Sequence, residues 1–355
     1  HDREQVARLA QQLGYEGEFQ FELERGGSIV LQQRPPEARR DPRLKGPPPD
    51  RILAFVSATP AGSDPDPPMR GRPRVSVQRT WFALYEPTAE RLIGTAVVLP
   101  GLFGTPGFTI DPLIADLRSR GFAVVRMLAP PSRYIERDEF SALAAFDGRL
   151  LGRELGQLGR QRFAETAYAV EAVLEHLQQG DDARRFPSPR VMVAMSGGAL
   201  AAPAVAVRTP GSFDATVLIA GGANFAVIAG QSNYRDGIGA VGFAGDAERR
   251  ARASGRAITL DLQAYFRANP LDPSLAVFAY RDQPVLLVHG TRDRAVPAES
   301  GDALFQALTT GGARVERLEY PVGHEVLFLI VAFKTDTIAD WLVEQIQPEN
   351  APAPP

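Results

Sequence analysis

A serine at the end of an apolar segment is the first candidate for chemistry in this sequence. Ser196 follows the apolar run 191–195 and is followed at once by Gly197 and Gly198. A strand that turns sharply into a helix needs small residues two positions before and after such a serine, and Ala194 and Gly198 meet that need. The turn would hold the hydroxyl at a helix N-terminus, where the free N–H groups favour a developing anion. The alternative interpretation is a serine that merely caps a helix.

An acid and a base follow later, each just after a strand-like segment. Asp293 lies in the loop after PVLLVHG (284–290), and His324 follows EYPVG (319–323) and precedes a helical segment. Ligands of open α/β sheets bind at the carboxyl edge of the strands, so this edge would bring both side chains toward Ser196. The alternatives are that Asp293 only forms a turn and that His324 is a structural histidine.

The sequence offers few other candidates for the base, because it contains only four histidines. His1 begins the sequence, and His176 lies on a helical segment among charged residues. His289 ends a strand and is expected in the core or in support of the site. His324 alone combines a preceding glycine, a strand end and a following helix.

Strand-like and helical segments alternate from about residue 74 onward. We expect a helix over 111–121 capped by Asp111, a long helix over about 148–179 and a last helix over 325–346. The intervening strands are continuous apolar runs, which are typical of a parallel sheet with helices on both faces. The sequence therefore predicts an α/β fold with a mostly parallel, doubly wound sheet.

Proline-rich and glycine-rich stretches set the expected domain boundaries. Residues 34–50 and 59–73 are rich in proline, which removes a backbone donor, and are expected to be loops. Residues 223–283 interrupt the alternation with glycine-rich loops and are predicted to be an insertion that serves as a cap or lid. The predicted units are an N-terminal extension (1–73), a main domain (74–346) and a proline-rich tail (347–355).

Four motifs together resemble the α/β-hydrolase superfamily over about residues 74–346. They are AMSGG around Ser196, HGTRDRAVP around Asp293, GHE around His324, and PGLFGTPG at 100–107. The resemblance implies an α/β-hydrolase catalytic domain in which Ser196 is the nucleophile and His324 transfers its proton. Asp293 would orient His324 and stabilise its charged form.

The resemblance also implies an oxyanion hole, made by the backbone N–H of Gly197 and that of Leu102 or Phe103. Two positions depart from the family pattern. Ala194 stands where the family usually has glycine, and Pro100 stands where the oxyanion loop usually has histidine. Pro100 cannot supply an imidazole, so the loop must be supported in another way.

A substrate pocket is predicted from apolar residues near the expected edge of the sheet. These side chains could equally belong to the core. The predicted pocket residues are Phe108, Met195, Asn224, Phe225 and Phe243, with Phe103 as a further candidate.

Composition narrows the classes of function. The 39 Lys and Arg residues against 42 Asp and Glu give a formal net charge of −3, which argues against a dedicated nucleic-acid or anionic-membrane binder. The chain has no cysteine and only scattered histidines, so we expect no thiolate chemistry, no metal and no cofactor. The longest apolar run near the C-terminus, 326–333, is far shorter than the ~20 residues of a transmembrane helix.

The resemblance implies a serine hydrolase that cleaves a small-molecule carboxylic ester or acyl substrate through an acyl-enzyme. An amide or peptide hydrolase, or an acyltransferase, could use the same residues, and a catalytically silent binding protein could use the same fold. Dehalogenase-like or epoxide-opening chemistry is disfavoured, because those relatives have aspartate at the position of Ser196. The first residue, which is not methionine, the absence of cysteine and the proline-rich tail slightly favour an exported protein over a cytoplasmic one.

Overall fold

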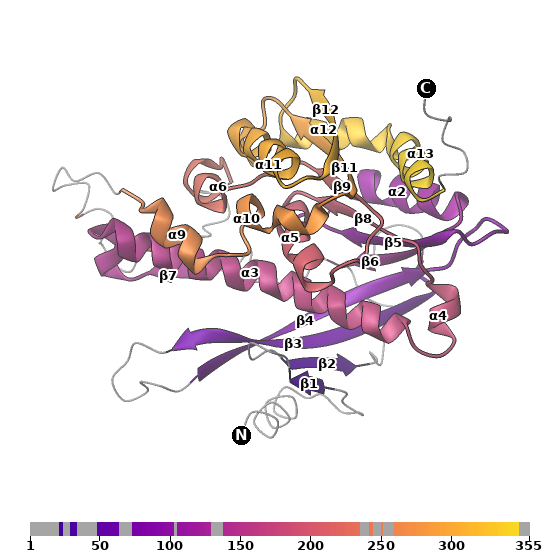
Figure 1. Ribbon diagram of the computed structural model, residues 1–355, viewed down its shortest axis with the longest axis horizontal. Coiled ribbons are helices and arrows are strands. Elements are labelled where there is room, and N and C mark those ends of the chain that lie inside the picture. Colours follow the sequence, from indigo (N-terminus) through magenta and orange to yellow (C-terminus); the bar gives the residue numbers. More distant parts are fainter. Residues whose placement is uncertain are drawn as a thin grey trace.

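A ten-stranded sheet forms the centre of the computed structural model, which describes residues 21–23, 29–33, 48–63, 73–102, 105–128, 138–234, 241–243, 250 and 259–347 (Figure 1). Its strands are β1 (Phe21–Leu23), β2 (Ile29–Gln33), β3 (Arg51–Ser63), β4 (Pro73–Tyr85), β5 (Gly94–Leu99), β6 (Phe122–Met127), β8 (Arg190–Met195), β9 (Ala215–Ile219), β11 (Pro284–Gly290) and β12 (Arg314–Tyr320).

The strands lie in the order β1-β2-β3-β4-β6-β5-β8-β9-β11-β12. The pairs from β1 to β6 are antiparallel, and every pair from β6 to β12 is parallel. The parallel strands are joined through helices, because a parallel pair needs a long crossover. The expected mostly parallel, doubly wound sheet is confirmed.

Helices cover both faces of the sheet. They are α2 (Gly107–Ser119), α3 (Gly148–Leu177), α4 (Asp182–Arg185), α5 (Gly197–Arg208), α6 (Phe225–Gln231), α9 (Leu262–Ala268), α10 (Pro273–Ala276), α11 (Ala298–Thr310), α12 (His324–Ala332) and α13 (Thr335–Ile346), with 3₁₀ turns η3 (Ala142–Ala145) and η4 (Val277–Tyr280). A separate two-stranded sheet pairs β7 (Asp138–Phe140) with β10 (Val241–Phe243) in parallel.

Two apolar cores lie on opposite faces of the sheet. One is filled from α3, α5 and α11, and the other from α2, α12 and α13. Side chains of a strand alternate between faces, so in β6 Ala123 and Val125 enter the first core while Phe122 and Val124 enter the second. Every residue of β5, β6 and β8 is buried, which explains their nearly continuous apolar sequences.

Several boundaries differ from those expected from the sequence. Helix α2 begins at Gly107, before Asp111, because the carbonyl oxygen of Pro106 accepts the first backbone N–H groups of the helix. The single helix expected over 325–346 is two helices, α12 and α13, separated at 333–334. Residues 59–63, expected as a loop, form the end of β3, where its pairing with β4 shifts in register. The described strands of the predicted extension, 1–73, therefore add to the antiparallel end of the main sheet.

Segment 223–283 connects β9 to β11. In its described part, α9 lies beside the beginning of α3 and α10 packs against α5 and α11 (Figure 1). Four glycines on α3, at 148, 152, 156 and 159, face this segment. A Cβ on Gly152 would overlap the backbone oxygen of Asp261, and one on Gly156 would lie 2.5 Å from the backbone oxygen of Tyr265. We call these four residues the glycine seam. Each glycine destabilises the helix by about 1 kcal/mol relative to alanine. The close contact with α9 is therefore accompanied by a lower intrinsic stability of α3.

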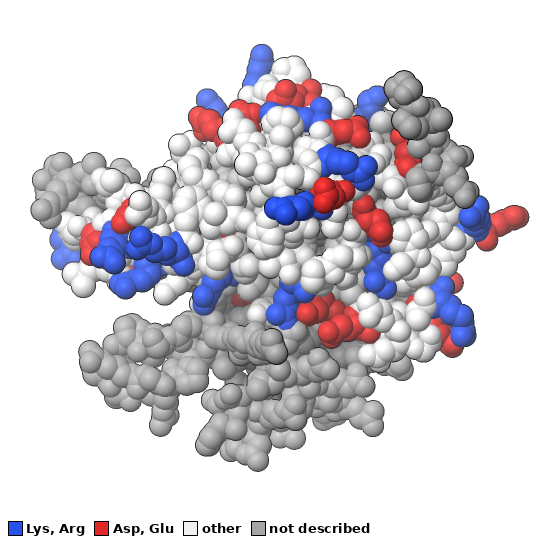
Figure 2. Space-filling model, viewed as in Figure 1, with Lys and Arg blue, Asp and Glu red and all other residues white. Residues whose placement is uncertain are grey.

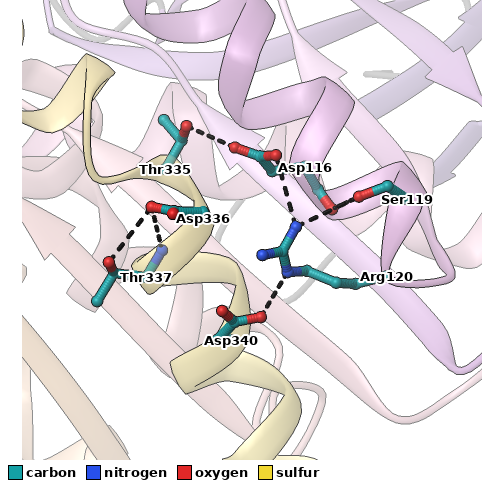
Figure 3. A network of polar contacts seen from close by, with 7 residues as sticks. All are labelled: Asp116, Ser119, Arg120, Thr335, Asp336, Thr337 and Asp340. Atoms are coloured by element: carbon teal, nitrogen blue, oxygen red, sulfur yellow. Dashed lines mark hydrogen bonds and ion pairs between the residues drawn. The ribbon is translucent and has the colours of Figure 1, made fainter.

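Polar contacts tie the C-terminal end of α2 to α13 (Figure 3). The Nε atom of Arg120 donates to Asp340 over 2.6 Å, and the hydroxyl of Thr335 donates to Asp116 over 2.6 Å. Arg120 and Asp340 are partly exposed, so their ion pair stabilises the fold by at most about 1 kcal/mol, whereas Thr335 is buried. Together the two contacts fix the direction of α2, whose other end lines the cavity described below.

The surface carries both signs of charge. Blue and red side chains are interspersed over the face shown in Figure 2. Within the described ranges, the structure contains no helix with the length and apolar character needed to cross a membrane.

The glycine seam gives a stability prediction. In Gly156→Ala the added methyl group would meet the backbone oxygen of Tyr265 at 2.5 Å and Cβ of Ala268 at 2.7 Å, so α9 must move away from α3. We expect the free energy of unfolding, measured with denaturant, to fall by about 1–3 kcal/mol, as overpacking generally costs. Gly230→Ala in α6, where an added Cβ has open space, is the matched control and should be neutral or slightly stabilising. A Gly156→Ala protein as stable as wild type would contradict the seam.

Candidate active site

Ser196 lies at a strained turn between β8 and α5. Its backbone has φ 49° and ψ −116°, a conformation that costs a non-glycine residue on the order of 1–3 kcal/mol. Hydrogen bonds hold the turn on both sides, from the Ser196 N–H to the oxygen of Ile219 (2.8 Å) and from the Leu200 N–H to the oxygen of Ser196 (3.0 Å). The turn places the serine at the N-terminus of α5, as the sequence predicts.

The start of α5 packs directly on the loop after β5. A Cβ on Gly198 would lie 2.6 Å from the oxygen of Pro100, and one on Gly197 would lie 2.6 Å from the side chain of Leu102. The Gly198 N–H donates to that Pro100 oxygen over 3.0 Å. Side chains at positions 197 and 198 would therefore push the loop away from Ser196.

His324 and Asp293 complete a chain of hydrogen bonds that begins at Ser196. Ser196 Oγ lies 3.0 Å from His324 Nε2, and His324 Nδ1 lies 2.6 Å from Asp293 Oδ2. A carboxylate only accepts, so Nδ1 carries the hydrogen and Nε2 is left to accept from the serine hydroxyl. The other Asp293 oxygen accepts the backbone N–H groups of Ala295 (2.8 Å) and Val296 (2.9 Å), which fixes the carboxylate. All three side chains are buried or nearly so.

The three residues come from the positions that the sequence predicts. Ser196 follows β8, Asp293 follows β11, and His324 follows β12 and begins α12, so all three meet at the carboxyl edge of the parallel strands. The strand order, with Ser196, His324 and Asp293 hydrogen-bonded at the carboxyl edge of the sheet, is the arrangement of the α/β-hydrolase fold. The chain has the α/β-hydrolase fold.

Known structures that resemble this chain do so at low sequence identity. Est1E from Butyrivibrio proteoclasticus is 15% identical, with a TM-score of 0.46, over 76% of this chain and 95% of that one. An acylaminoacyl peptidase from Pyrococcus horikoshii is 12% identical, with a TM-score of 0.47, over 93% of this chain and 49% of that one. The Pyrococcus furiosus esterase Pf2001 is 13% identical, with a TM-score of 0.46, over 76% of this chain and 87% of that one. No family model and no curated protein matches the sequence.

Two backbone nitrogens of this α/β-hydrolase fold lie close enough together to form an oxyanion hole. Gly197 is the first residue of α5, where N–H groups have no acceptor within the helix. The backbone nitrogen of Leu102 lies 3.2 Å from the position that a Gly197 Cβ would occupy. Phe103, the other predicted donor, lies outside the described residues.

Thr105 links the loop after β5, which is the expected oxyanion loop, to the end of β8. Its hydroxyl oxygen accepts the Gly101 N–H at 3.3 Å and lies 3.4 Å from Met195 Sδ, to which it donates. Met195 is the last residue of β8, next to Ser196. The hydroxyl of Thr105 therefore joins the loop to the strand that presents the serine.

A cavity of about 350 Å³ contains Ser196 and His324 in its wall. This volume lies within the usual range for small-molecule sites. The wall is largely apolar, and its remaining lining residues are Gly101, Leu102, Thr105, Pro106, Phe108, Tyr234, Glu325 and Phe328.

Of the predicted pocket residues whose side chains the structure describes, the cavity contains Phe108 alone. Met195 is fully buried in the core beneath the sheet edge, because residues alternate between faces and position 195 faces α2 and α12. Asn224 and Phe225 lie away from the cavity: their backbone N–H groups donate to the buried carboxylate of Asp272, over 3.1 and 2.8 Å. The ring of Phe225 packs in the opposite core. The side chain of Phe243, in β10, lies outside the described part of the structure.

Sequence reasoning missed Tyr234, Glu325 and Phe328, which surround His324. The rings of Tyr234 and Phe328 contact the imidazole edge-on, with centroid distances of 5.8 and 5.2 Å. The hydroxyl of Tyr234 donates to Glu325 Oε1 over 2.7 Å. This bond, the residue's own backbone N–H and the nearby imidazole lower the pKa of the Glu325 carboxyl, while burial and Glu325 raise the pKa of Tyr234. The sequence position of Glu325, directly after His324, could have indicated that it lies at the site. No sequence signal indicated Tyr234, because it lies far from His324 in the sequence.

His289 is a fully buried histidine just behind the site. Its ring packs so closely on Gly301 of α11 that a Cβ there would overlap it. Neither ring nitrogen has a hydrogen-bond partner among the described residues, and burial lowers the pKa of His289. His289 is therefore a neutral core residue, in agreement with the sequence prediction.

The described ranges contain no group of three or more His, Asp or Glu side chains placed to hold a metal ion.

The support of the oxyanion loop can be tested with a single hydroxyl. Thr105→Val keeps the side-chain shape and removes the acceptor of the Gly101 N–H. We expect Ser196 to react with an organofluorophosphonate about tenfold more slowly, a smaller loss than the about hundredfold or more for deleting an oxyanion donor outright. Thr105→Ser, which keeps the hydroxyl, is the control and should react at nearly the wild-type rate. Equal rates for Thr105→Val and wild type would show that the loop has another support.

His289 predicts a contribution to the pH dependence of stability. Because burial lowers its pKa, the unfolded chain takes up a proton below about pH 6.5 that the folded chain does not, so the free energy of unfolding falls with falling pH. His289→Gln removes this titration, whatever it does to stability at neutral pH. We expect the loss of unfolding free energy between about pH 7.5 and pH 5.5 to be smaller in the variant by on the order of 1 kcal/mol. Denaturant titrations at the two pH values measure it, and identical losses would contradict a buried neutral imidazole.

Proposed function

We propose that the protein is a serine hydrolase that cleaves a carboxylic ester through an acyl-enzyme intermediate. The observation that carries this proposal is the hydrogen-bonded chain from Ser196 Oγ through His324 to Asp293 Oδ2, in the wall of a largely apolar cavity. A nucleophile, a base and a group that orients the base stand in order, which is the arrangement used for acyl transfer.

In the first half of the reaction, Ser196 Oγ attacks the ester carbonyl carbon while His324 Nε2 takes the hydroxyl proton. The carbonyl oxygen becomes an oxyanion, and the backbone N–H groups of Gly197 and Leu102 would donate to it. As the tetrahedral intermediate collapses, the bond to the alcohol oxygen breaks and Nε2 gives its proton to the leaving alkoxide. The acyl group remains bound to Ser196 Oγ.

In the second half, His324 Nε2 takes a proton from a water molecule that attacks the acyl carbon. The bond to Oγ then breaks, the carboxylic acid leaves, and the proton on Nε2 returns to Ser196. Asp293 stabilises the imidazolium in both halves of the reaction. Two backbone N–H groups hold its carboxylate in place, and Oδ2 lies at hydrogen-bond distance from His324 Nδ1.

The strained turn at Ser196 supports the same role. The positive φ holds the serine in one orientation before substrate binds, so less reorganisation is needed when Oγ attacks. The small volume and apolar walls of the cavity suit a small ester better than a polymeric substrate. Amide hydrolysis and acyl transfer to another acceptor would use the same side chains.

The nucleophile gives the direct test. We expect Ser196→Ala to lower the turnover of a short p-nitrophenyl ester by about 10³-fold or more, since loss of the nucleophile removes the acyl-enzyme route. Ser300→Ala is the matched control: Ser300 is buried in α11, does not line the cavity, and should keep wild-type turnover. Full activity in Ser196→Ala would contradict the mechanism.

Covalent labelling separates an enzyme from a silent relative of the same fold. An organofluorophosphonate should label wild-type protein at one site, and His324→Ala should block the labelling because the base is lost. An unreactive Ser196 would favour a binding protein. Esters, thioesters and amides of one acyl group, tested on purified protein, then identify the leaving group.

A further inference from the structure

Glu325 is the one carboxylate in the cavity wall among the residues that the structure describes. The lining set contains no lysine or arginine, and apart from His324 its other members are uncharged. Among the described lining residues, a charge at Glu325 would therefore act on a bound substrate without an opposite charge beside it.

The Glu325 carboxylate is held next to the reacting atoms. It follows His324 directly in the first turn of α12, where the helix dipole favours a negative charge. The hydroxyl of Tyr234 fixes Oε1 at 2.7 Å, and the ring of that tyrosine contacts the imidazole of His324. These contacts keep the carboxylate in the wall while its exposed position leaves room for a substrate group beside it.

We propose that Glu325 selects substrates by charge, so that the cavity favours esters with a cationic group, accepts neutral ones and disfavours those with an additional anionic group. This inference rests on the proposed ester hydrolysis. The charged group meant here is a substituent of the substrate, such as an ammonium or a second carboxylate, and it does not take part in the reaction.

The carboxylate is ionised when the enzyme would work, because the hydrogen bond from Tyr234 and the neighbouring imidazole keep the pKa of Glu325 below its usual range. Asp293 does not add to the selection in the same way, since its carboxylate is covered by His324 and by two backbone N–H groups. Glu325 also favours the imidazolium that forms on His324, but this effect is common to all substrates and cancels in a ratio of rates.

For unit charges several ångströms apart in a partly solvated site, the interaction corresponds to about a three- to tenfold change in rate. A cationic and an anionic substrate shift in opposite directions. Their ratio should therefore depend on Glu325 by about tenfold or more.

Glu325→Gln separates charge from structure. The glutamine carbonyl oxygen can still accept the Tyr234 hydroxyl, so the contact between α12 and the segment after α6 is kept while the charge is removed. Tyr234→Phe does the opposite, removing the hydrogen bond and keeping the carboxylate. Glu344→Gln, an exposed position on α13 outside the cavity lining, is the control for the change in net charge.

The experiment measures kcat/KM for three p-nitrophenyl esters of equal chain length that end in a methyl, an ammonium or a carboxylate group. In wild type we expect the order ammonium, methyl, carboxylate. In Glu325→Gln the ammonium-to-carboxylate ratio should fall about tenfold, while Glu344→Gln and Tyr234→Phe keep most of the wild-type ratio. Raising the salt concentration should lower the ratio in wild type more than in Glu325→Gln.

An unchanged ratio in Glu325→Gln, with the methyl ester still hydrolysed, would overturn the charge selection and leave the proposed function standing. An equal fall in Tyr234→Phe and Glu325→Gln would also overturn it, because pocket shape would then set the ratio. If no ester is hydrolysed and Ser196 is not labelled by the fluorophosphonate, both proposals fail together.

Discussion

The site depends on one close contact, between the start of α5 and the loop after β5. Gly197 and Gly198 carry no side chains, so the start of α5 packs directly on the backbone oxygen of Pro100 and on the side chain of Leu102. The contact holds the strained serine turn, brings the nitrogens of Gly197 and Leu102 side by side, and lets the Pro100 oxygen accept the Gly198 N–H. The serine, the two backbone nitrogens and part of the cavity wall are thus positioned by one contact between α5 and the loop after β5.

The base reaches this contact from the other core. His324 begins α12, and α12 packs beside α2, where the hydroxyl of Thr109 donates to the oxygen of Phe328 over 3.1 Å. α2 supplies Phe108 to the cavity at its first turn and is tied to α13 at its last turn. The imidazole is therefore placed by a layer of three helices that is independent of the glycines around Ser196, and the cavity lies where the two arrangements meet.

The sequence was sufficient to predict features that depend on local pattern. Ser196, Asp293 and His324 each follow a strand in the parallel part of the sheet, so parallel pairing alone brings them to one edge. The sheet class follows from buried apolar strands such as β8 and β11, whereas β12 is an edge strand whose residues are exposed or half-buried. Among the described pocket candidates, Met195, Asn224 and Phe225 lie away from the cavity, because residue type alone does not reveal which face a side chain will cover. Met195 and Phe225 are residue types that commonly line pockets. Strand alternation nevertheless places Met195 in the core, and the backbone N–H of Phe225 is bound by the buried carboxylate of Asp272, away from the cavity. Thr105 and Tyr234 act through contacts between distant segments, for which the linear sequence carries no signal.

The glycine seam of α3 has a consequence for how the chain tolerates change. Its contact with α9 is made by main-chain oxygens and by the small side chains of Ala264 and Ala268, so it depends on shape at the facing positions of both helices. Replacements on the outer surface of α9 can therefore accumulate without loosening the inserted segment, whereas the facing positions of α3 admit a hydrogen atom and nothing larger. The two sides of this interface therefore tolerate substitution unequally: the outer positions of α9 can vary, whereas the four glycines of α3 cannot.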